Sequence, residues 1–258
     1  MSNEFNLIQC EEKGHTLWIT LNRPPLNILD IPTLTELKLT LDEAVNRQDI
    51  QFLVLRGAGE KAFSAGNDVK DHTPERVGPM LTVFHDVIST LLTTDKITIA
   101  AVRGYCFGGG MELAMVCDFV IATEKALFSQ PEIALACFPP VATVYLARLI
   151  GHRRAIEMLL TGDRIDACQA ERLGLVTRTV GEEELEAAVT EVITKLSAHS
   201  PVALRLTKEA LRFSSAPDLI SGLKAVERLY LDRLMATEDA REGIAAFLEK
   251  RAPVWKGR

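Results

Sequence analysis

Short apolar runs alternate with amphipathic stretches along the first half of the chain. Residues 52–57, 97–102 and 118–122 form compact apolar runs, which predict buried strands. Between them, apolar positions recur every three or four residues in 31–45 and again in 81–91, which predicts two amphipathic helices. This alternation predicts an α/β core whose strands are mostly parallel.

Both ends of the chain depart from this alternation. Residues 5–10 and 16–21 predict two strands around a turn at Lys13–Gly14. From about residue 182 onward every periodic stretch is helical, and helix-start signals stand at Pro201, Pro217 and Thr237. We therefore expect a core domain over residues 1–182 and a helical region over residues 183–258.

Composition excludes several classes of protein. The 258 residues are 47% hydrophobic and 25% charged, which suits a globular protein with a large core. The formal net charge of -6 argues against a nucleic-acid binder. Residues 1–15 lack the basic flank and apolar region of a signal peptide, and no apolar run is long enough to span a bilayer, so a cytoplasmic protein without a membrane partner is expected. Neither the five cysteines nor the five histidines show metal-ligand spacing, so no metal site is expected.

Two glycine-containing turns are the first candidates for chemistry. Residues 63–68 follow the predicted strand 52–57, and residues 108–112 follow the predicted strand 97–102. Peptide N–H groups at the carboxyl ends of buried strands often bind ligands in α/β sheets. Two such groups aimed at one point would form an oxyanion hole, although either turn alone is more often an ordinary tight turn. The glycine spacing matches neither a dinucleotide fingerprint nor a phosphate-binding loop.

Two glutamates are the candidate acid–base groups. Glu112 lies in the first turn of a predicted helix among apolar neighbours, so its carboxyl is expected to be partly buried and to need a partner or a task. A favourable interaction with the helix dipole is the simpler explanation of Glu112. Glu132 follows Gln130-Pro131 and, by itself, reads as a loop carboxylate. His72 follows the first turn and is a candidate pocket residue, with a surface position as the alternative.

Taken together and in order, these stretches resemble the enoyl-CoA hydratase/isomerase family, also called crotonases. The resemblance covers nearly the whole chain and rests on residues 22–24, 61–68, 100–115, 117–118, 128–133, 160–163, 170–176 and 247–253. It implies a spiral of ββα units followed by a C-terminal helical region that builds trimers, often paired into hexamers.

The resemblance also implies roles for particular residues. The two oxyanion-hole N–H groups of the family fall on Asn67 and Gly109, and its two catalytic glutamates fall on Glu112 and Glu132. The implied partner is an acyl-CoA substrate, and no cofactor is implied beyond the coenzyme A that the substrate carries. The presence of both glutamates favours water addition over the double-bond isomerases and decarboxylases of the same scaffold. A non-catalytic subunit that binds coenzyme A is the alternative from a different class.

Substrate contacts are expected from three places. Lys61 occupies a position near the nucleotide part of coenzyme A in relatives, and the two turns contribute Ala65, Gly66, Asp68, His72 and Gly108. The third place is the segment Pro139-Pro140-Val141, expected to form a rigid apolar wall of the acyl pocket. Family hydratases usually have Pro-Gly-x-Gly-Gly here, whereas Pro140 lacks an N–H. This segment, with Asp71-His72-Thr73-Pro74, resembles the subgroup that hydrates cyclohexa-1,5-diene-1-carbonyl-CoA; a straight-chain enoyl-CoA is the alternative.

Overall fold

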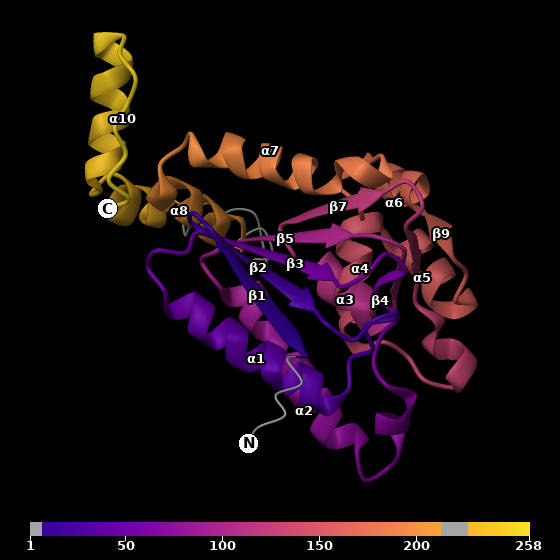
Figure 1. The fold of residues 1–258 in the computed structure, drawn as a ribbon. Coiled ribbons are helices and arrows are strands. Elements are labelled where there is room, and N and C mark those ends of the chain that lie inside the picture. Colours follow the sequence, from indigo (N-terminus) through magenta and orange to yellow (C-terminus); the bar gives the residue numbers. More distant parts are fainter. Residues whose placement is uncertain (1–6, 213–226) are drawn as a thin grey trace. The chain divides into compact units, whose positions relative to one another are not determined.

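The structure is a computed structural model that describes residues 7–212 and 227–258 (Figure 1). The chain divides into two compact units, one made of residues up to Thr94 with Thr98–Val189, the other of Asp95–Ile97 with Thr190–Arg258. The sequence placed a boundary at 182/183, and the assembly role expected for residues 183–258 stays a prediction. Pro217 and the first two residues of the predicted strand 5–10 lie outside the described residues.

The larger sheet of the first unit has six strands in the order β1-β2-β3-β5-β7-β10. Its strands are β1 (Ile8–Lys13), β2 (Thr16–Leu21), β3 (Phe52–Gly57), β5 (Ile97–Val102), β7 (Phe119–Thr123) and β10 (Arg178–Val180). β1 pairs antiparallel with β2, whereas the pairs β2–β3, β5–β7 and β7–β10 are parallel. The strands predicted at 16–21, 52–57, 97–102 and 118–122 are confirmed, and the first strand begins at Ile8.

A second, four-stranded sheet was missed by the sequence analysis. Its strands, in spatial order, are β4 (Ala62–Ser64), β6 (Tyr105–Phe107), β8 (Leu127–Ser129) and β9 (Ile165–Asp166). β4, β6 and β8 pair in parallel, and β9 runs antiparallel to β8. Strands of two or three residues are too short to show a period of two in the sequence, which is why they escaped prediction.

The chain repeats one motif four times, which confirms the expected spiral of ββα units. Each repeat contributes one strand to the larger sheet, or a hairpin in the first case, followed by a helix. The four helices are α1 (Ile31–Asn46), α2 (Val77–Thr93), α3 (Gly109–Met115) and α4 (Pro140–Ile150). The rest of the unit contains α5 (His152–Thr161), α6 (Ala167–Leu173) and three short 3-10 helices at Val69–His72, Pro131–Leu135 and Glu182–Glu184.

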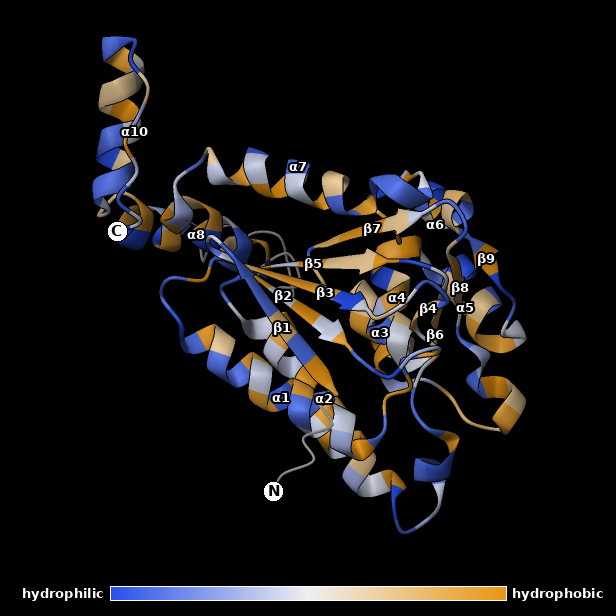
Figure 2. Ribbon diagram, in the orientation of Figure 1, coloured by the Kyte–Doolittle hydropathy of each residue, from blue (hydrophilic) through white to orange (hydrophobic). Residues whose placement is uncertain are grey.

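The predicted amphipathic helices bury the faces that their periodicity indicated. In α1 the side chains of Leu34, Leu37 and Leu41 are fully buried, and α1 packs against α2. In α2 the buried positions are Met80, Phe84, Val87, Ile88 and Leu91. Figure 2 shows hydrophobic colours over most of β5 and β7, in keeping with a sheet buried between other elements.

The second unit is helical, with α7 (Leu185–Ser197) running into it from the first. It contains α8 (Pro201–Arg212), a π-helical turn (Leu229–Leu234) and α10 (Glu238–Glu249), so Pro201 and Thr237 do precede or begin helices as predicted. The buried carboxylate of Asp239 accepts hydrogen bonds from Ser200 Oγ (2.6 Å) and from the peptide N–H groups of Lys256 (2.7 Å) and Gly257 (3.0 Å). These bonds fix the last residues of the chain along α10.

The described residues contain neither a candidate membrane span nor a candidate metal cluster. No helix there combines the length and the apolar character that a membrane span requires. No group of three or more His, Cys, Asp or Glu side chains within residues 7–212 and 227–258 is arranged to hold a metal ion.

Asn27 ties together the two connections that precede the predicted site. Its side chain is 1% exposed, and its backbone has a positive φ of 50°. Its amide donates to the carbonyl oxygens of Ala58 (3.0 Å) and Ala62 (2.8 Å) and accepts from the N–H of Arg23 (3.0 Å). One buried side chain therefore joins the segment between β2 and α1 to the turn between β3 and β4.

We predict that Asn27→Ala lowers the free energy of unfolding by about 2–4 kcal/mol, because three backbone groups lose their partner in a buried place. Urea denaturation measures the change. Asn46→Ala is the matched control, since the amide of Asn46 is exposed and bonds only to Asp42 in its own helix. We expect the control to change stability by less than about 0.5 kcal/mol. Equal midpoints for the two variants would contradict the role assigned to Asn27.

Candidate active site

The predicted site turns follow the short strands of the second sheet. The prediction that they directly follow the strands 52–57 and 97–102 is wrong, because β4 and β6 intervene. β4, β6 and β8 are parallel neighbours, so their carboxyl ends lie at one edge of the sheet. Three turns meet at that edge: Ala65-Gly66-Asn67 after β4, Gly108-Gly109 after β6, and Gln130-Pro131-Glu132 after β8.

In the first turn, only one peptide N–H is left without a partner. The N–H of Ala65 donates to Leu26 (2.9 Å), that of Gly66 to Ser64 Oγ (3.1 Å), and that of Asp68 to Leu29 (3.1 Å). Leu29 and Asn67 form a parallel bridge in which Leu29 makes both bonds, so the N–H of Asn67 points away from Leu29. Within the described part of the chain that N–H has no acceptor.

The second turn supplies another such N–H. Gly109 is the first residue of α3, so its N–H has no acceptor within the helix. Gly108 has a φ of +52°, a conformation that favours glycine. A Cβ on Gly66 would lie 3.4 Å from the nitrogen of Gly109, and a Cβ on Gly109 would lie 2.5 Å from Asn67 Oδ1. The two turns therefore touch, and the two unpaired N–H groups come from adjoining turns.

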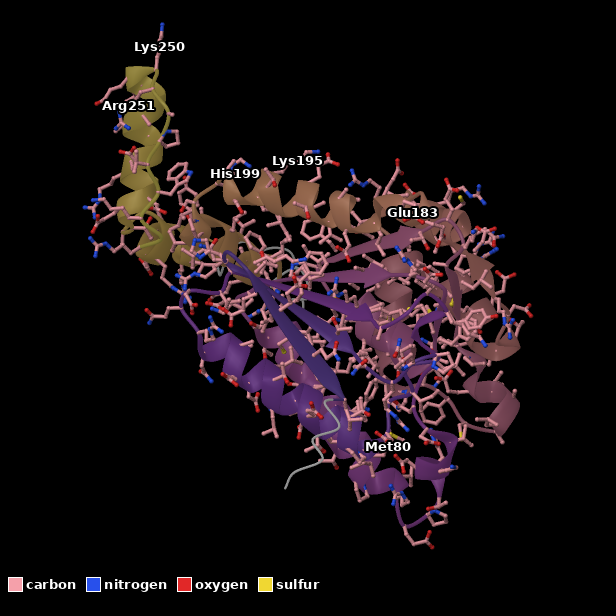
Figure 3. The ribbon with its side chains drawn as sticks, viewed as in Figure 1. Met80, Glu183, Lys195, His199, Lys250 and Arg251 are labelled. Carbon is pink, nitrogen blue, oxygen red and sulfur yellow. The ribbon has the colours of Figure 1, made fainter. Side chains whose placement is uncertain are left out.

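The side chain of Asn67 extends toward α2. Its Nδ2 lies 3.4 Å from the sulfur of Met80, a buried residue near the N-terminal end of that helix (Figure 3). This contact from the side chain and the bridge to Leu29 from the backbone hold Asn67 from two directions.

Glu112 is almost completely buried, with 2% of its surface exposed. Its Oε1 accepts a hydrogen bond of 2.8 Å from the peptide N–H of Ala142, in the first turn of α4. Burial raises the pKa of Glu112 to about 7; the Ala142 N–H opposes the rise and the charge of Glu132 adds to it. The buried carboxyl of Glu112 does have a partner, as expected, and that partner is the N-terminus of α4. The sequence did not reveal it.

Glu132 lies in the 3-10 helix that follows β8 and is half-buried. A Cβ on Gly108 would lie 2.7 Å from its Oε1, so this carboxyl rests against the second turn. With its nitrogen facing Glu132, the buried amide of Gln130 donates to both carboxylate oxygens, at 3.2 and 3.1 Å. Burial raises the pKa of Glu132 to about 7, opposed by its own peptide N–H.

The segment Pro139-Pro140-Val141 forms the start of α4, and its role as a wall of the acyl pocket stays a prediction. Pro139 precedes α4, and Pro140 is its first residue, a position where the missing N–H costs nothing. Pro139 and Val141 are buried, and the N–H groups of Val141 and Ala142 both favour the charged form of Glu112. Two prolines before an apolar run are a helix-start signal that could have revealed α4.

Three predicted substrate-binding residues lie before and after β4: Lys61 directly precedes the strand, Asp68 follows the first turn, and His72 ends the 3-10 helix Val69–His72. Lys61 is exposed, and its carbonyl accepts from the N–H of Tyr105 (3.0 Å). Asp68 caps the 3-10 helix after the first turn by accepting from the N–H of Lys70, and Nδ1 of His72 bonds to the carbonyl of Asp68 (3.0 Å). Within residues 7–212 and 227–258, none of these side chains bonds to either glutamate.

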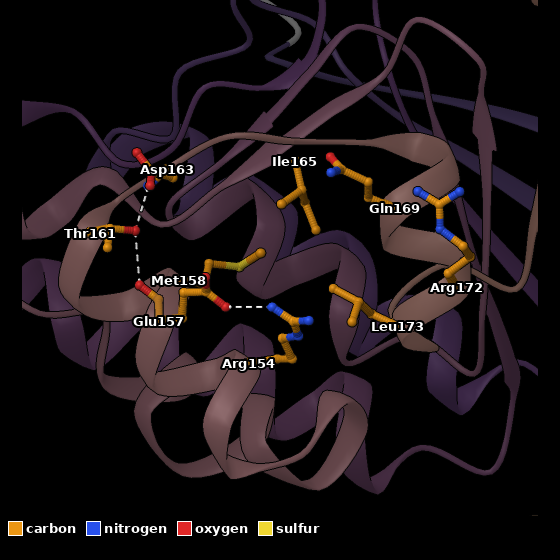
Figure 4. A pocket seen from close by; sticks show the side chains of 9 residues that line it. All are labelled: Arg154, Glu157, Met158, Thr161, Asp163, Ile165, Gln169, Arg172 and Leu173. Carbon is orange, nitrogen blue, oxygen red and sulfur yellow. Dashed lines mark hydrogen bonds and ion pairs between the residues drawn. The ribbon is translucent and has the colours of Figure 1, made fainter.

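A separate hollow lies between α5, β9 and α6 (Figure 4). It is lined by Arg154, Glu157, Met158, Thr161, Asp163, Ile165, Gln169, Arg172 and Leu173. Arg154 pairs with Glu157 at 2.8 Å, one turn further along α5. None of the residues predicted to bind substrate lines this hollow, so it is distinct from the edge where the three turns meet.

Comparison with known proteins agrees with the geometry. The family model described as "Enoyl-CoA hydratase/isomerase" matches residues 11–258. A probable enoyl-CoA hydratase of Mycobacterium tuberculosis is 40% identical over 257 residues, which are 98% of this chain and 99% of the relative. The cyclohexa-1,5-dienecarbonyl-CoA hydratase of Thauera aromatica is 36% identical over 255 residues, which are 97% of this chain and 96% of the relative.

Solved structures lead to the same family. The crystal structure of an enoyl-CoA hydratase from Bacillus anthracis has a TM-score of 0.92 and 36% sequence identity, and the match covers 97% of this chain and 99% of that one. Sequence and fold thus agree over almost the whole length, and the protein belongs to the enoyl-CoA hydratase/isomerase family.

Proposed function

We propose that this protein adds water to a carbon–carbon double bond conjugated with a coenzyme A thioester. The observation that carries the proposal is that two unpaired peptide N–H groups, the buried carboxyl of Glu112 and the half-buried carboxyl of Glu132 all come from turns at one sheet edge. The names of the relatives point to the same reaction class. The reaction moves only water and protons, so it calls for no redox cofactor.

The peptide N–H groups of Asn67 and Gly109 bind the thioester oxygen. When water adds to the far end of the conjugated system, negative charge moves onto that oxygen and gives an enolate. Fixed donors stabilise such a charge strongly because they need no reorientation; removing one typically raises a barrier by about 3 kcal/mol. Gly109 adds the positive end of the α3 dipole to this stabilisation.

Glu112 and Glu132 move the protons. One carboxylate takes a proton from water as its oxygen bonds to the substrate, and the other carboxyl gives a proton to the α-carbon. Both pKa values lie at about 7, so one charged and one protonated carboxyl can coexist at neutral pH. The charge of Glu132 raises the pKa of Glu112, which favours the state in which only one of the two is ionised.

For the acyl group we propose a flat cyclic dienoyl unit. The rigid start of α4 supports this preference, since Pro139 and Pro140 fix the backbone beside buried Val141. A preordered wall suits a rigid substrate, which loses little conformational freedom on binding. The relative named cyclohexa-1,5-dienecarbonyl-CoA hydratase supports the ring. The more identical relative, named only an enoyl-CoA hydratase, supports a straight-chain substrate as the second candidate.

Conservative substitutions test the role of the two glutamates. Glu112→Gln and Glu132→Gln should each lower kcat by about 10²–10⁴-fold, the usual contribution of a general acid or base. Binding of free coenzyme A, measured by calorimetry, should stay unchanged because neither carboxyl is assigned a contact with it. A variant that hydrates at the wild-type rate would remove that glutamate from the mechanism. Conversion of the substrate to a positional isomer, with no hydrated product, would favour a double-bond isomerase instead.

The raised pKa of Glu112 also predicts a pH-dependent cost in stability. The folded protein holds this proton more tightly than the unfolded chain, so the stabilisation is complete below pH 4.5 and is lost as the pH rises through about 7. Glu112→Gln should therefore gain stability relative to wild type between pH 5 and pH 8, by at most about 3 kcal/mol. Urea denaturation at both pH values measures this difference. Glu60→Gln, at an exposed turn, is the control and should show no such gain; an equal response of the two variants would refute the assignment.

The last prediction here concerns the acyl group. Wild type should have a higher kcat/KM for the cyclic dienoyl-CoA than for crotonyl-CoA. In Pro140→Gly this preference should shrink several-fold, as expected for about 1 kcal/mol of lost backbone rigidity. A wild-type preference for crotonyl-CoA would exclude the ring and leave the glutamate mechanism standing.

A further inference from the structure

Asp71 is a buried carboxylate that has no role in the proposed mechanism, and its motif in the sequence gave it no contact or task. It is 2% exposed, and it lies four residues after Asn67 in the 3-10 helix Val69–His72. Its Oδ2 accepts from the peptide N–H of Ile31 (3.0 Å), and its Oδ1 accepts from Nε of Arg76 (2.6 Å). A buried carboxylate is costly unless such donors satisfy it, so these two bonds define where the segment can lie.

The bond to Ile31 is the last of three that attach the site segment to one stretch of chain. Leu29 N–H donates to Gly66 (3.0 Å), Asp68 N–H donates to Leu29 (3.1 Å), and Ile31 N–H donates to Asp71. Asn67 lies between the first two. Ile31 begins α1, a helix of 16 residues packed against α2 (Figure 1), so the attachment point is rigid.

Little else supports the far end of the segment. The 3-10 helix has four residues, and its bonds are local: the N–H groups of Lys70 and Asp71 donate to Asp68, and Nδ1 of His72 bonds to the carbonyl of Asp68. Residues 73–76 beyond it are exposed. Such a short 3-10 turn is not stable by itself. Without Asp71, the carbonyl of Gly66 and the N–H of Asp68 would keep their bonds to Leu29, but the turn after Asp68 would lose its anchor.

We propose that Asp71 is a positioning residue for the reaction: through its bond to the N-terminus of α1 it holds the peptide N–H of Asn67 in line with that of Gly109. Arg76, which is largely exposed, balances the buried charge from the solvent side. The inference rests on the proposed function, because it concerns the direction of an oxyanion-hole donor. A misplacement of about 1 Å in such a group costs on the order of 10²-fold in rate.

The test compares two aspartates at the start of the same helix. Asp71→Ala removes the link to the site segment, and Asp71→Asn is a milder variant that keeps one acceptor. Asp30→Ala is the matched control, because Asp30 caps α1 through Thr33 and pairs with Arg23 but has no hydrogen bond to residues 66–71. Both alanine variants destabilise the same end of α1.

Three quantities are measured well below each melting temperature: kcat, the affinity for free coenzyme A, and the red shift of a conjugated thioester bound in a Glu112→Gln background. Polarisation of the thioester carbonyl by the two N–H groups produces that shift, so it reports their alignment. We expect Asp71→Ala to lower kcat by about 10–100-fold and to reduce the red shift, with Asp71→Asn between it and wild type. Affinity for free coenzyme A, which has no carbonyl at this place, should stay the same.

Two results would overturn the inference. One is an Asp71→Ala protein with the wild-type red shift and kcat; the other is an Asp30→Ala protein that loses both to the same extent, which would make the effect one of helix stability. Absence of hydration and of any red shift in the otherwise unaltered protein would instead sink the proposed function, before Asp71 is tested.

Discussion

The site depends on the parallel pairing of three very short strands. β4, β6 and β8 contribute three residues each, and their pairing aligns three turns that are separated by about forty and by about twenty residues of chain. Glycine makes the alignment close: a side chain at Gly109 or Gly110 would meet Asn67 or Ser64 at 2.5 Å. So few ladder bonds cannot hold such an edge alone. The larger sheet and the helices α1 and α2, with their buried leucine and aromatic side chains, provide the rigid frame on which it rests.

The sequence predicts most strands of the larger sheet and the helices packed on it. It does not predict the short strands or the groups that bond to the two glutamates. Apolar runs such as 52–57 and 97–102 indicate buried strands because most of their residues are apolar, and α1 shows its leucines at helical spacing. The motifs likewise indicated Asn67, Gly109, Glu112 and Glu132. A strand of three residues is too short to show an alternating pattern in the sequence. The partners of the glutamates are peptide N–H groups and one side-chain amide, and such groups occur throughout any sequence. Ala142 holds Glu112 through its backbone, so its side chain gave no sign of the role.

The burial of the two ionisable carboxyls lowers the stability of the fold at neutral pH. Burial favours the neutral acid, and the N-terminus of α4 favours the charged form, so Glu112 is held between the two. A fold selected for stability alone would place an uncharged side chain there, since an amide of the same shape can accept from Ala142 without a charge to bury. A carboxyl whose pKa lies near neutral pH therefore lowers the stability of the protein. This is the usual trade-off between stability and activity.

Pro140 bears both on the carboxyl of Glu112 and on the backbone beside the proposed acyl group. Proline is well suited to the first position of a helix, so it strengthens the start of α4 while leaving that position without an N–H. The first available donors are then those of Val141 and Ala142, and both interact with Glu112. One residue thus fixes the helix terminus that holds a carboxyl and stiffens the backbone beside the proposed acyl group. We therefore expect a change at Pro140 to affect proton transfer and substrate choice together. The two effects separate only when kcat/KM is compared across a rigid and a flexible substrate, because the shift in acid–base chemistry is common to both and cancels in the ratio.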